Sequence, residues 1–513
     1  MTTRTLSSSS FFLLPLVSLL LHTGCDHQIF TGKREARGVW MSRFEYAVDS
    51  VRANPDVAKA IIRNVFERAR KARLNMVFFQ VRGNADAFYR SSLEPWSAML
   101  SDSLGKDPGW DPLAFAVEEA HRLGLELHAW VNTFPVWRGP GLPQETTPRP
   151  VVLEHPEWIA CDSSGTPMSL KQSGYIWGSP GNPALRDHIV SVVKEITGNY
   201  DVDGIHFDYV RYPEGSTVRG YSRDSVSVAR FESAESNPSH LPWEYWQREQ
   251  VNEFVAAAYD SVTGMKPWVK ISAAVIGKYD GSGWTSYHAV FQDPYRWMER
   301  EKIDFVVPMV YWQRSHPTHP FIPLIAQWHD RIAHKRPVLP GLSTGLQDKF
   351  GWSEISEQIR AVRKQGLPGV VFFASGGLEK AWKILQVDEF PYWSLPPSMP
   401  WKDSIPPMPP TDLAAVASAS SITLTWSADT TEPLSYVVYR FSGKEIGRNN
   451  VLRILALTRR NATSFVDDDP LSGPATYVVS SVDRMSNESA TGAILEMPIT
   501  ALNFTTPKAV ATR

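Results

Sequence analysis

Short apolar segments alternate with longer amphipathic segments through most of the chain. From Arg37 onward, runs rich in Val, Ile and Phe are followed by stretches in which apolar residues recur at helical spacing. Repeated strand and helix units around a parallel sheet produce this pattern. It predicts eight strands, at residues 38–42, 76–82, 126–132, 204–210, 269–275, 305–311, 338–343 and 369–374. Helices are predicted at residues 57–72, 112–123, 183–197, 243–262, 294–301, 323–332 and 353–365.

Each predicted strand is apolar along almost its whole length, which indicates that both of its faces are covered. Eight strands of this kind close most economically into a (β/α)8 TIM barrel, an α/β fold. We assign this barrel to residues 33–394. In such barrels the functional groups lie at the C-terminal ends of the strands and in the loops that follow.

The pattern changes after Trp393. Prolines are frequent over residues 395–410, and because proline cannot continue a helix or a central strand, this segment is expected to be a linker. Residues 411–500 carry short alternating segments that predict a small all-β sandwich. The aromatic residues of this part, among them Trp426 and Tyr436, make it similar to a fibronectin type III domain.

The first residues have the pattern of an export signal. An apolar stretch at residues 11–21 is about half the length needed to cross a bilayer. It is followed by Leu-His-Thr-Gly-Cys, which resembles a bacterial lipobox that ends at Cys25, although His22 stands where Leu is usual. We expect residues 1–25 to be a signal peptide and Cys25 to be lipidated, so that the protein is anchored to a membrane of the bacterial cell envelope. The alternative is ordinary signal-peptidase cleavage near Gly24.

Composition narrows the class of partner. The 52 Lys and Arg residues against 54 Asp and Glu leave a net charge of −2, with no basic excess to bind a phosphate backbone, so nucleic acid is not an expected partner. Nineteen Trp residues favour a ligand with apolar faces, such as a sugar ring.

There are two cysteines, and Cys161 is expected to be a packed thiol. Because no third ligand stands at metal spacing, neither a metal nor another cofactor is expected.

Polar and aromatic residues gather at the predicted C-terminal ends of the strands. We take ten of them as candidates for substrate binding, the aromatic ones as surfaces on which sugar rings stack: Gln80, Arg82, His128, Trp130, Asn132, His206, Tyr209, Arg211, Tyr311 and Trp312. The two arginines have two open interpretations. Each either holds a substrate carboxylate or fixes an acidic residue of the barrel rim.

Hydrolysis of a glycosidic bond normally uses two carboxyl groups. Asp208 is the best single candidate, because it stands at the end of the fourth predicted strand between Phe207 and Tyr209. Burial there can set its protonation. The second carboxyl stays open between Asp86 and Glu45, both of which follow strands whose ends carry polar partners.

Seven stretches in register resemble the bacterial glycosyl-hydrolase-like family 10. They are Arg34–Trp40, Phe79–Arg82 with Ala85–Tyr89, Glu94–Ser97, Asp111–Leu113, His128–Asn132, Asp203–Pro213 and Val307–Trp312. The resemblance covers residues 33–394 in order. It implies an envelope glycoside hydrolase, often lipid-anchored, that acts on peptidoglycan glycan strands without stem peptides.

The sequence also argues against one related mechanism. The strand-four stretch is also similar to the chitinase signature, but Val210 stands where chitinases have their acidic Glu, which speaks against a chitinase mechanism. Two alternative functions stay open. A non-catalytic carbohydrate-binding protein of the cell envelope would use the same barrel, because one fold hosts many functions. A hydrolase of an external polysaccharide is the other alternative.

Overall fold

The structure is a computed structural model that describes residues 32–48, 54–331, 333, 335–418, 420–428, 434–444 and 446–497. The chain divides into two units, residues 1–31 and residues 32–513. The predicted signal peptide and Cys25 lie outside the described residues.

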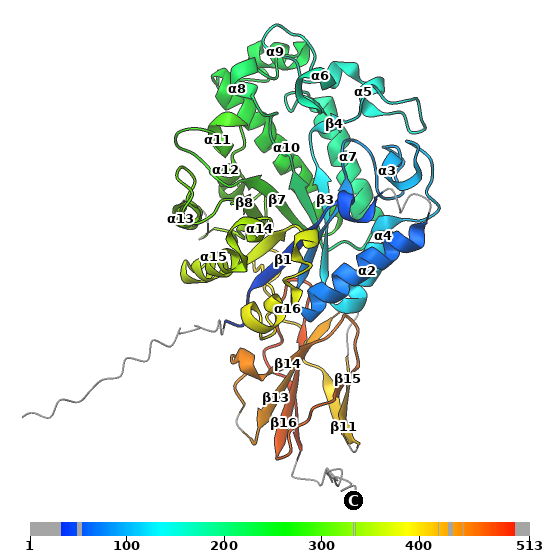
Figure 1. Ribbon diagram of the computed structural model, residues 1–513, viewed down its shortest axis with the longest axis vertical. Helices are drawn as coiled ribbons and strands as arrows, with labels where there is room; N and C mark the ends of the chain where they lie inside the picture. The colour runs from blue at the N-terminus through cyan, green and yellow to red at the C-terminus, as the bar shows by residue number, and fades with distance from the viewer. Residues whose placement is uncertain are drawn as a thin grey trace, which may run out of the picture. The chain divides into compact units, whose positions relative to one another are not determined.

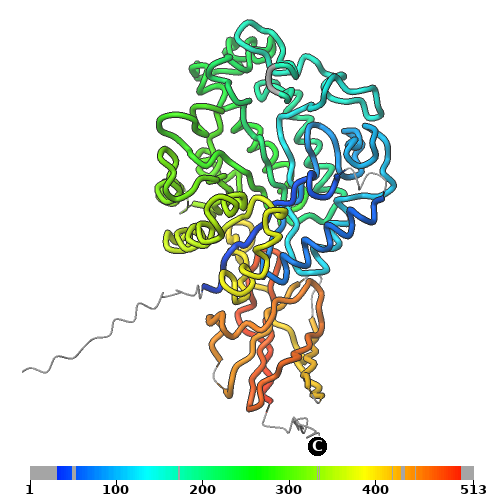
Figure 2. The backbone as a smooth tube through the Cα atoms, in the orientation of Figure 1, coloured from blue at the N-terminus to red at the C-terminus, as the bar shows by residue number. Residues whose placement is uncertain are grey.

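Eight parallel strands form a closed barrel, in the order β1-β10-β9-β8-β7-β6-β3-β2. Strand β1, the first of the barrel, pairs with β10, the last, so the ends of this part of the chain meet (Figure 2). The strands are β1 (Ala36–Met41), β2 (Met76–Arg82), β3 (Glu126–Asn132), β6 (Gly204–Asp208), β7 (Lys270–Ile276), β8 (Phe305–Met309), β9 (Gly341–Ser343) and β10 (Gly369–Phe373). The predicted (β/α)8 barrel is confirmed.

Helices surround the strands (Figure 1). The longer ones are α2 (Pro55–Lys71), α4 (Pro112–Leu123), α7 (Pro183–Asn199), α10 (Trp243–Met265), α12 (Pro294–Glu299), α13 (Phe321–Arg331) and α15 (Trp352–Lys364). Helix α4 shows why the sequence places them here. The Asp111 side chain caps the N-terminus of the helix by accepting a hydrogen bond from Ala114 N. The helix ends at Gly124, whose φ of 71° is a conformation that glycine adopts readily. Its observed bounds are those predicted.

Shorter elements lie in the loops around these helices. They are α1 (Arg43–Tyr46), α3 (Ala98–Ser101), α5 (Val151–Glu154), α6 (Leu170–Ser173), α8 (Ser216–Arg219), α9 (Ser225–Glu232), α11 (Ser286–Ala289), α14 (Leu346–Phe350), α16 (Trp382–Ile384), and the small hairpin β4 (Pro135–Trp137) with β5 (Ile176–Trp177). Single turns are η1 (Pro156–Trp158), η2 (Ser375–Leu378), η3 (Leu385–Glu389) and η4 (Val451–Arg453).

Four barrel strands are shorter than predicted: β6 ends at Asp208 and not at residue 210, β10 ends at Phe373 and not at residue 374, and β8 and β9 are shorter as follows. Strand β9 spans residues 341–343 and not 338–343, because Pro340 has no N–H to give to the ladder. Val338 keeps only an isolated bridge to Val306. Strand β8 ends at Met309, so Tyr311 lies in the loop after it and not in the strand.

The C-terminal part is a β-sandwich of two sheets. One contains β11 (Thr411–Ala417), β12 (Ile422–Ser427) and β15 (Ser464–Asp467), in that order. The other has the order β14 (Ile454–Leu457), β13 (Ser435–Ser442), β16 (Ala475–Val482) and β17 (Ala493–Met497). Leu424, Trp426, Tyr436 and Tyr477 are buried together between the sheets. The predicted all-β part is confirmed.

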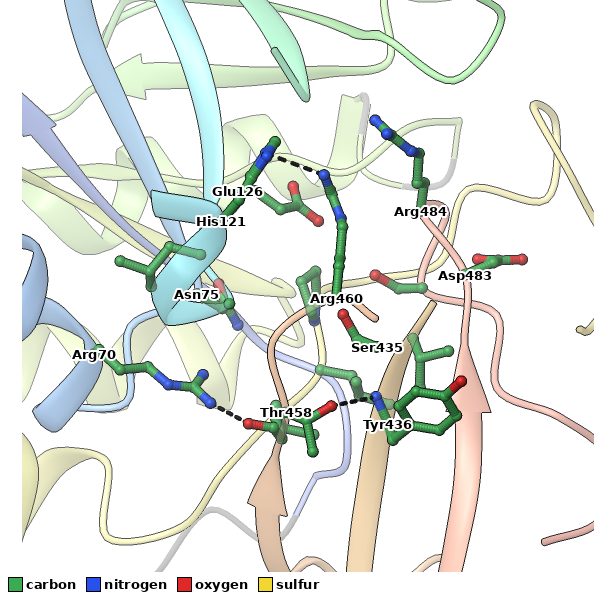
Figure 3. Close-up of a pocket in the computed structure, with 17 residues that line it drawn as sticks. Arg70, Asn75, His121, Glu126, Ser435, Tyr436, Thr458, Arg460, Asp483 and Arg484 are labelled. Carbon is green, nitrogen blue, oxygen red and sulfur yellow. Dashed lines mark hydrogen bonds between the residues drawn. The ribbon is translucent and has the colours of Figure 1, made fainter. Parts of the chain in front are cut away.

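The sandwich packs against the N-terminal ends of the barrel strands. Met485 from the sandwich is buried in the same apolar cluster as Met76 and Phe305 from barrel strands. Arg460 donates to His121 at 3.0 Å (Figure 3). It also forms an ion pair with Asp203, which precedes β6. Arg484 pairs with Asp201 at 2.8 Å. This end of the barrel is therefore closed, and the opposite, C-terminal end is left for a ligand.

Candidate active site

Asp208 is the last residue of β6, at the C-terminal end of the barrel. Its side chain is 8% exposed, and one carboxyl oxygen accepts from the backbone N–H of Tyr209 at 2.6 Å. Tyr209 has a φ of 54°, which residues other than glycine rarely adopt. The backbone thus turns sharply after Asp208, and such strained residues are common at functional sites.

Burial raises the pKa of the Asp208 carboxyl to about 6. The Arg211 guanidinium and the Tyr209 N–H act in the opposite direction, since both favour the ionised form. A carboxyl with this pKa holds a proton in weakly acidic solution and gives it up near neutrality. This is the property that a general acid in glycoside hydrolysis requires.

A hydrogen-bonded network centred on Asn132 lies beside Asp208. Asn132 lies opposite Asp208 in the β3–β6 register. The Asn132 side chain accepts from Trp130 Nε1 at 3.1 Å and from Gln80 Nε2 at 3.2 Å, and it donates to Gly83 O at 3.0 Å. The structure therefore brings these three sequence candidates, Gln80, Trp130 and Asn132, together around Asp208.

The turn after β2 holds Asp86, one of the two candidates for the second carboxyl. Asp86 is buried, and its Oδ1 accepts from Asn84 N at 2.7 Å. Gly83 opens this turn, where an added Cβ would lie 2.5 Å from Arg43 Nη1 and 2.8 Å from Asp86 Oδ1. A larger residue here would displace the Arg43 and Asp86 side chains. The hydrogen bond from Asn132 to Gly83 O joins the Asp86 turn to the strand beside Asp208.

Glu45, the other candidate, is occupied by hydrogen bonds across the barrel rim. Its carboxylate accepts from Ser42 N at 2.6 Å and from Ser375 Oγ at 2.5 Å, and also from Gly376 N at that side. These bonds tie α1 to the turn after β10. Glu45 therefore links two parts of the rim. Asp86 and Glu45 both stay candidates for the second carboxyl.

Arg82 is paired inside the protein. Its Nε and Nη2 donate to the two oxygens of Glu94 at 2.8 and 2.7 Å, and both side chains are fully buried. Although burial opposes ionisation, Arg82 and His188 hold the pKa of Glu94 at about 2. Of the two interpretations of Arg82, the structure favours the one in which it fixes an acidic residue.

The two histidines are part of the barrel interior. His206 Nε2 accepts from Trp40 Nε1 at 3.0 Å, which leaves Nδ1 to donate to Ser272 Oγ at 2.9 Å. Burial holds the pKa of His206 well below its usual range, so it is neutral. His128 lies 3.1 Å from Glu126, near the end that the sandwich closes. Both side chains are fully buried.

Aromatic rings surround the open end. Tyr209 packs on Trp177 at 5.6 Å between ring centroids, and the Arg211 guanidinium lies 5.0 Å from the Tyr209 ring. Tyr311 stacks on Phe373 at 5.3 Å, and Phe373 is 37% exposed. Trp312 stacks on His319 at 4.6 Å. These rings are the surfaces on which sugars would stack.

The sequence pattern predicts no role for Arg43 or Phe373. Arg43 is the first residue of α1, separated from β1 by Ser42, and this position indicates only that it lies at the rim. Phe373 was interpreted as part of an apolar strand. Among the described residues there is no group of three or more His, Cys, Asp or Glu side chains placed to hold a metal ion. No helix of the described part of the chain is both long and apolar enough to cross a bilayer.

The barrel sequence matches a known family. Residues 35–351 match the family described as Glycosyl hydrolase-like 10. The chain belongs to this family. It is 27% identical to Glycosyl hydrolase YngK of Bacillus subtilis over 460 residues, which cover 83% of this chain and 86% of that protein. It is also 27% identical to Glycosyl hydrolase DigH of Escherichia coli K12 over 327 residues, 58% of this chain and 71% of that protein.

Among solved structures, the chain is similar to the glycoside hydrolase domain of PgaB from Bordetella bronchiseptica. The TM-score is 0.45 at 11% identity, covering 69% of this chain and 98% of that domain. Membership of the glycosyl hydrolase-like 10 family supports a glycosidase with a carbohydrate substrate. This family membership agrees with the buried Asp208 carboxyl and the aromatic rings at the same end of the barrel.

Proposed function

We propose that the protein is an exported glycoside hydrolase that cleaves glycosidic bonds in peptide-free peptidoglycan strands. The observation that carries the proposal is the Asp208 carboxyl at the open end of the barrel, buried and with its pKa raised to about 6. We assign Asp208 as the general acid, which protonates the leaving oxygen of the scissile bond.

Asp86 is proposed as the second carboxyl, which acts on the other side of the sugar as base or nucleophile. It lies on the turn that Asn132 joins to the Asp208 strand, and one of its oxygens is held by Asn84 N. The sugar ring would be placed by Tyr209, Tyr311 and Trp312, with Gln80, Trp130 and Asn132 fixing the surrounding polar groups.

Export and anchoring are part of the same proposal. The segment Leu21–Cys25 supports lipidation at Cys25 and a location at the bacterial cell envelope. In Cys25→Ser the protein should move from the membrane to the soluble fraction, because the acyl chains supply the anchor. Unchanged fractionation would argue against lipidation. The sandwich is proposed to be fibronectin type III-like, on the basis of its three- and four-stranded sheets.

The test is product analysis on peptide-free glycan strands with purified protein. Wild type should release fragments, and Asp208→Asn should release none while still binding the strands. Binding without cleavage by wild type would favour the non-catalytic, carbohydrate-binding alternative. Cleavage of plant or algal glycans alone would indicate a hydrolase of external polysaccharides.

A further inference from the structure

The rim beside Asp86 contains a groove of about 390 Å³, which we call the Arg43 groove. Its lining includes Arg43, Phe44, Asp86, Trp137 and Arg138. It extends from the turn after β2 to the β4 hairpin strand and lies at the end of the barrel that carries Asp208. A substrate chain bound at Asp208 therefore has this groove beside it.

Arg43 is a buried cation without a carboxylate partner. Its residue is 2% exposed, and no Asp or Glu oxygen of the described chain lies within 4.0 Å of its guanidinium. Its Nε and Nη1 make no hydrogen bond. Its Nη2 meets the Asn84 amide at 3.2 Å when that amide is oriented to donate to Gly83 O.

This state of Arg43 is unusual for a buried charge. A buried guanidinium is normally paired, because removing the charge from water destabilises the fold unless an opposite charge compensates. Arg82, at the end of the neighbouring strand β2, shows the ordinary arrangement, because it donates to both oxygens of Glu94. The Asp86 carboxylate lies near Arg43 at Gly83 but forms no ion pair with it, so the Arg43 guanidinium has no directly bound anion among the described residues. A buried cation in this state beside a groove indicates that a ligand supplies the bound anion.

Arg138 adds a second cation to the groove. It is exposed, and within the described residues it forms no ion pair; its Nη1 donates to Tyr175 OH at 3.2 Å. The guanidinium carbons of Arg43 and Arg138 lie 4.7 and 5.9 Å from the ring of Phe44, which is 52% exposed. The groove thus joins two positive charges to an exposed aromatic face.

We propose that the Arg43 groove is a subsite for a carboxylate carried by a sugar residue of the substrate, and that Arg43 determines specificity for it. The carboxylate would accept hydrogen bonds from the guanidiniums, and the sugar face would pack on Phe44. The proposal rests on the proposed function, since it names the chemistry of the same substrate. It applies to a carboxylate on a lactyl ether and to one on a uronic acid.

Binding measurements separate this proposal from the catalytic one. In Asp208→Asn protein, which does not consume ligand, calorimetry compares three oligosaccharides: peptide-free glycan fragments, the same fragments with their carboxylates converted to neutral amides, and a uronic acid oligosaccharide. We expect amide conversion to weaken binding by about tenfold or more. The uronic acid arm shows which source of carboxylate the groove takes.

Adding Arg43→Gln should remove the preference, so that the acidic and amidated fragments bind alike. Arg43→Lys should restore part of it, because the positive charge is kept. The matched control is Arg149→Gln, since Arg149 is an exposed arginine paired with Glu145 at 2.8 Å, and it should leave the preference unchanged. If Arg43→Gln does not fold, Arg138→Gln, an exposed site, replaces it with a smaller expected loss.

The outcomes are distinct. Equal binding of acidic and amidated fragments, or a preference that survives Arg43→Gln in folded protein, overturns the carboxylate subsite and leaves the hydrolase proposal standing. A preference that depends on Arg43, together with no cleavage by wild type, supports the subsite and overturns the hydrolase. Failure of all three ligands to bind overturns both.

Discussion

Asp208→Asn should abolish turnover and at the same time stabilise the folded protein at neutral pH. The carboxyl is buried, and burial is the main reason for its raised pKa. Asparagine has nearly the same shape but no charge to bury. The carboxyl that the reaction needs therefore lowers the free energy of unfolding above pH 6.

The magnitude follows from the pKa. A folded-state pKa of about 6 against an ordinary value of 3.8 corresponds to about 3 kcal/mol. Below pH 4 the carboxyl is protonated in both the folded and unfolded states and contributes no difference. Between pH 4 and pH 6 the unfolded state ionises first, so the free energy of unfolding falls as pH rises. Above pH 6 the full loss of about 3 kcal/mol is present.

The assay is urea denaturation of wild type and Asp208→Asn at about pH 4 and about pH 7. The free energy of unfolding of the variant minus that of wild type should be about 2.4 kcal/mol larger at the higher pH, because the unfolded carboxyl is already partly ionised at pH 4. Constant effects of the substitution cancel in this comparison. Asp468→Asn, at an exposed position of the sandwich, is the control and should show no such change. A difference that does not vary with pH would refute the assignment of a buried, raised-pKa carboxyl.

Three further substitutions test the interface, the electrostatics and the turn. Arg460→Met breaks the partly buried ion pair between sandwich and barrel and should lower the free energy of unfolding by about 2 kcal/mol in urea denaturation; an unchanged midpoint would mean that this ion pair does not stabilise the fold. Arg211→Gln removes a charge that favours ionised Asp208, so the alkaline limb of the kcat/KM profile should move to higher pH, and an unmoved limb would contradict the coupling. Gly83→Ala should lower kcat/KM at least about tenfold by displacing the charged groups that contact it, whereas Gly141→Ala, with open space around it, should not; equal activities would place the turn outside the site.

Local pattern was sufficient for most of the barrel. Strands β2 and β3 and helix α4 have the predicted bounds, since each is a sustained apolar or amphipathic run closed by Gly, Pro or Asp signals. In the sandwich, the sequence pattern predicts strands at residues 422–426, 435–440, 463–467 and 476–483, but not β11, β14 or β17. Strand β11 is largely exposed and rich in Ala, so it lacks the alternation that marks a half-buried strand. Its pairing with β12 is a tertiary contact that sequence does not display.

The candidate site was only partly predictable. Asp208 could be identified because its strand position fixes both its end of the barrel and its side. The pairing of the charged residues could not be predicted, because it depends on partners that are far away in the sequence. Arg82 is paired with Glu94, and Glu45 is bound by residues after β10, whereas Arg43 has no carboxylate partner among the described residues. For the same reason the docking of the sandwich on Asp203 was not foreseen.

The most direct test of the account is mass spectrometry of the products that wild-type protein releases from peptide-free glycan strands in heavy-oxygen water. Hydrolysis with Asp208 as the acid predicts fragments that carry one heavy oxygen atom at the new reducing end. The same digestion with Asp208→Asn should give no fragments. Fragments without the label, or equal release by the variant, would contradict the proposed hydrolysis through Asp208.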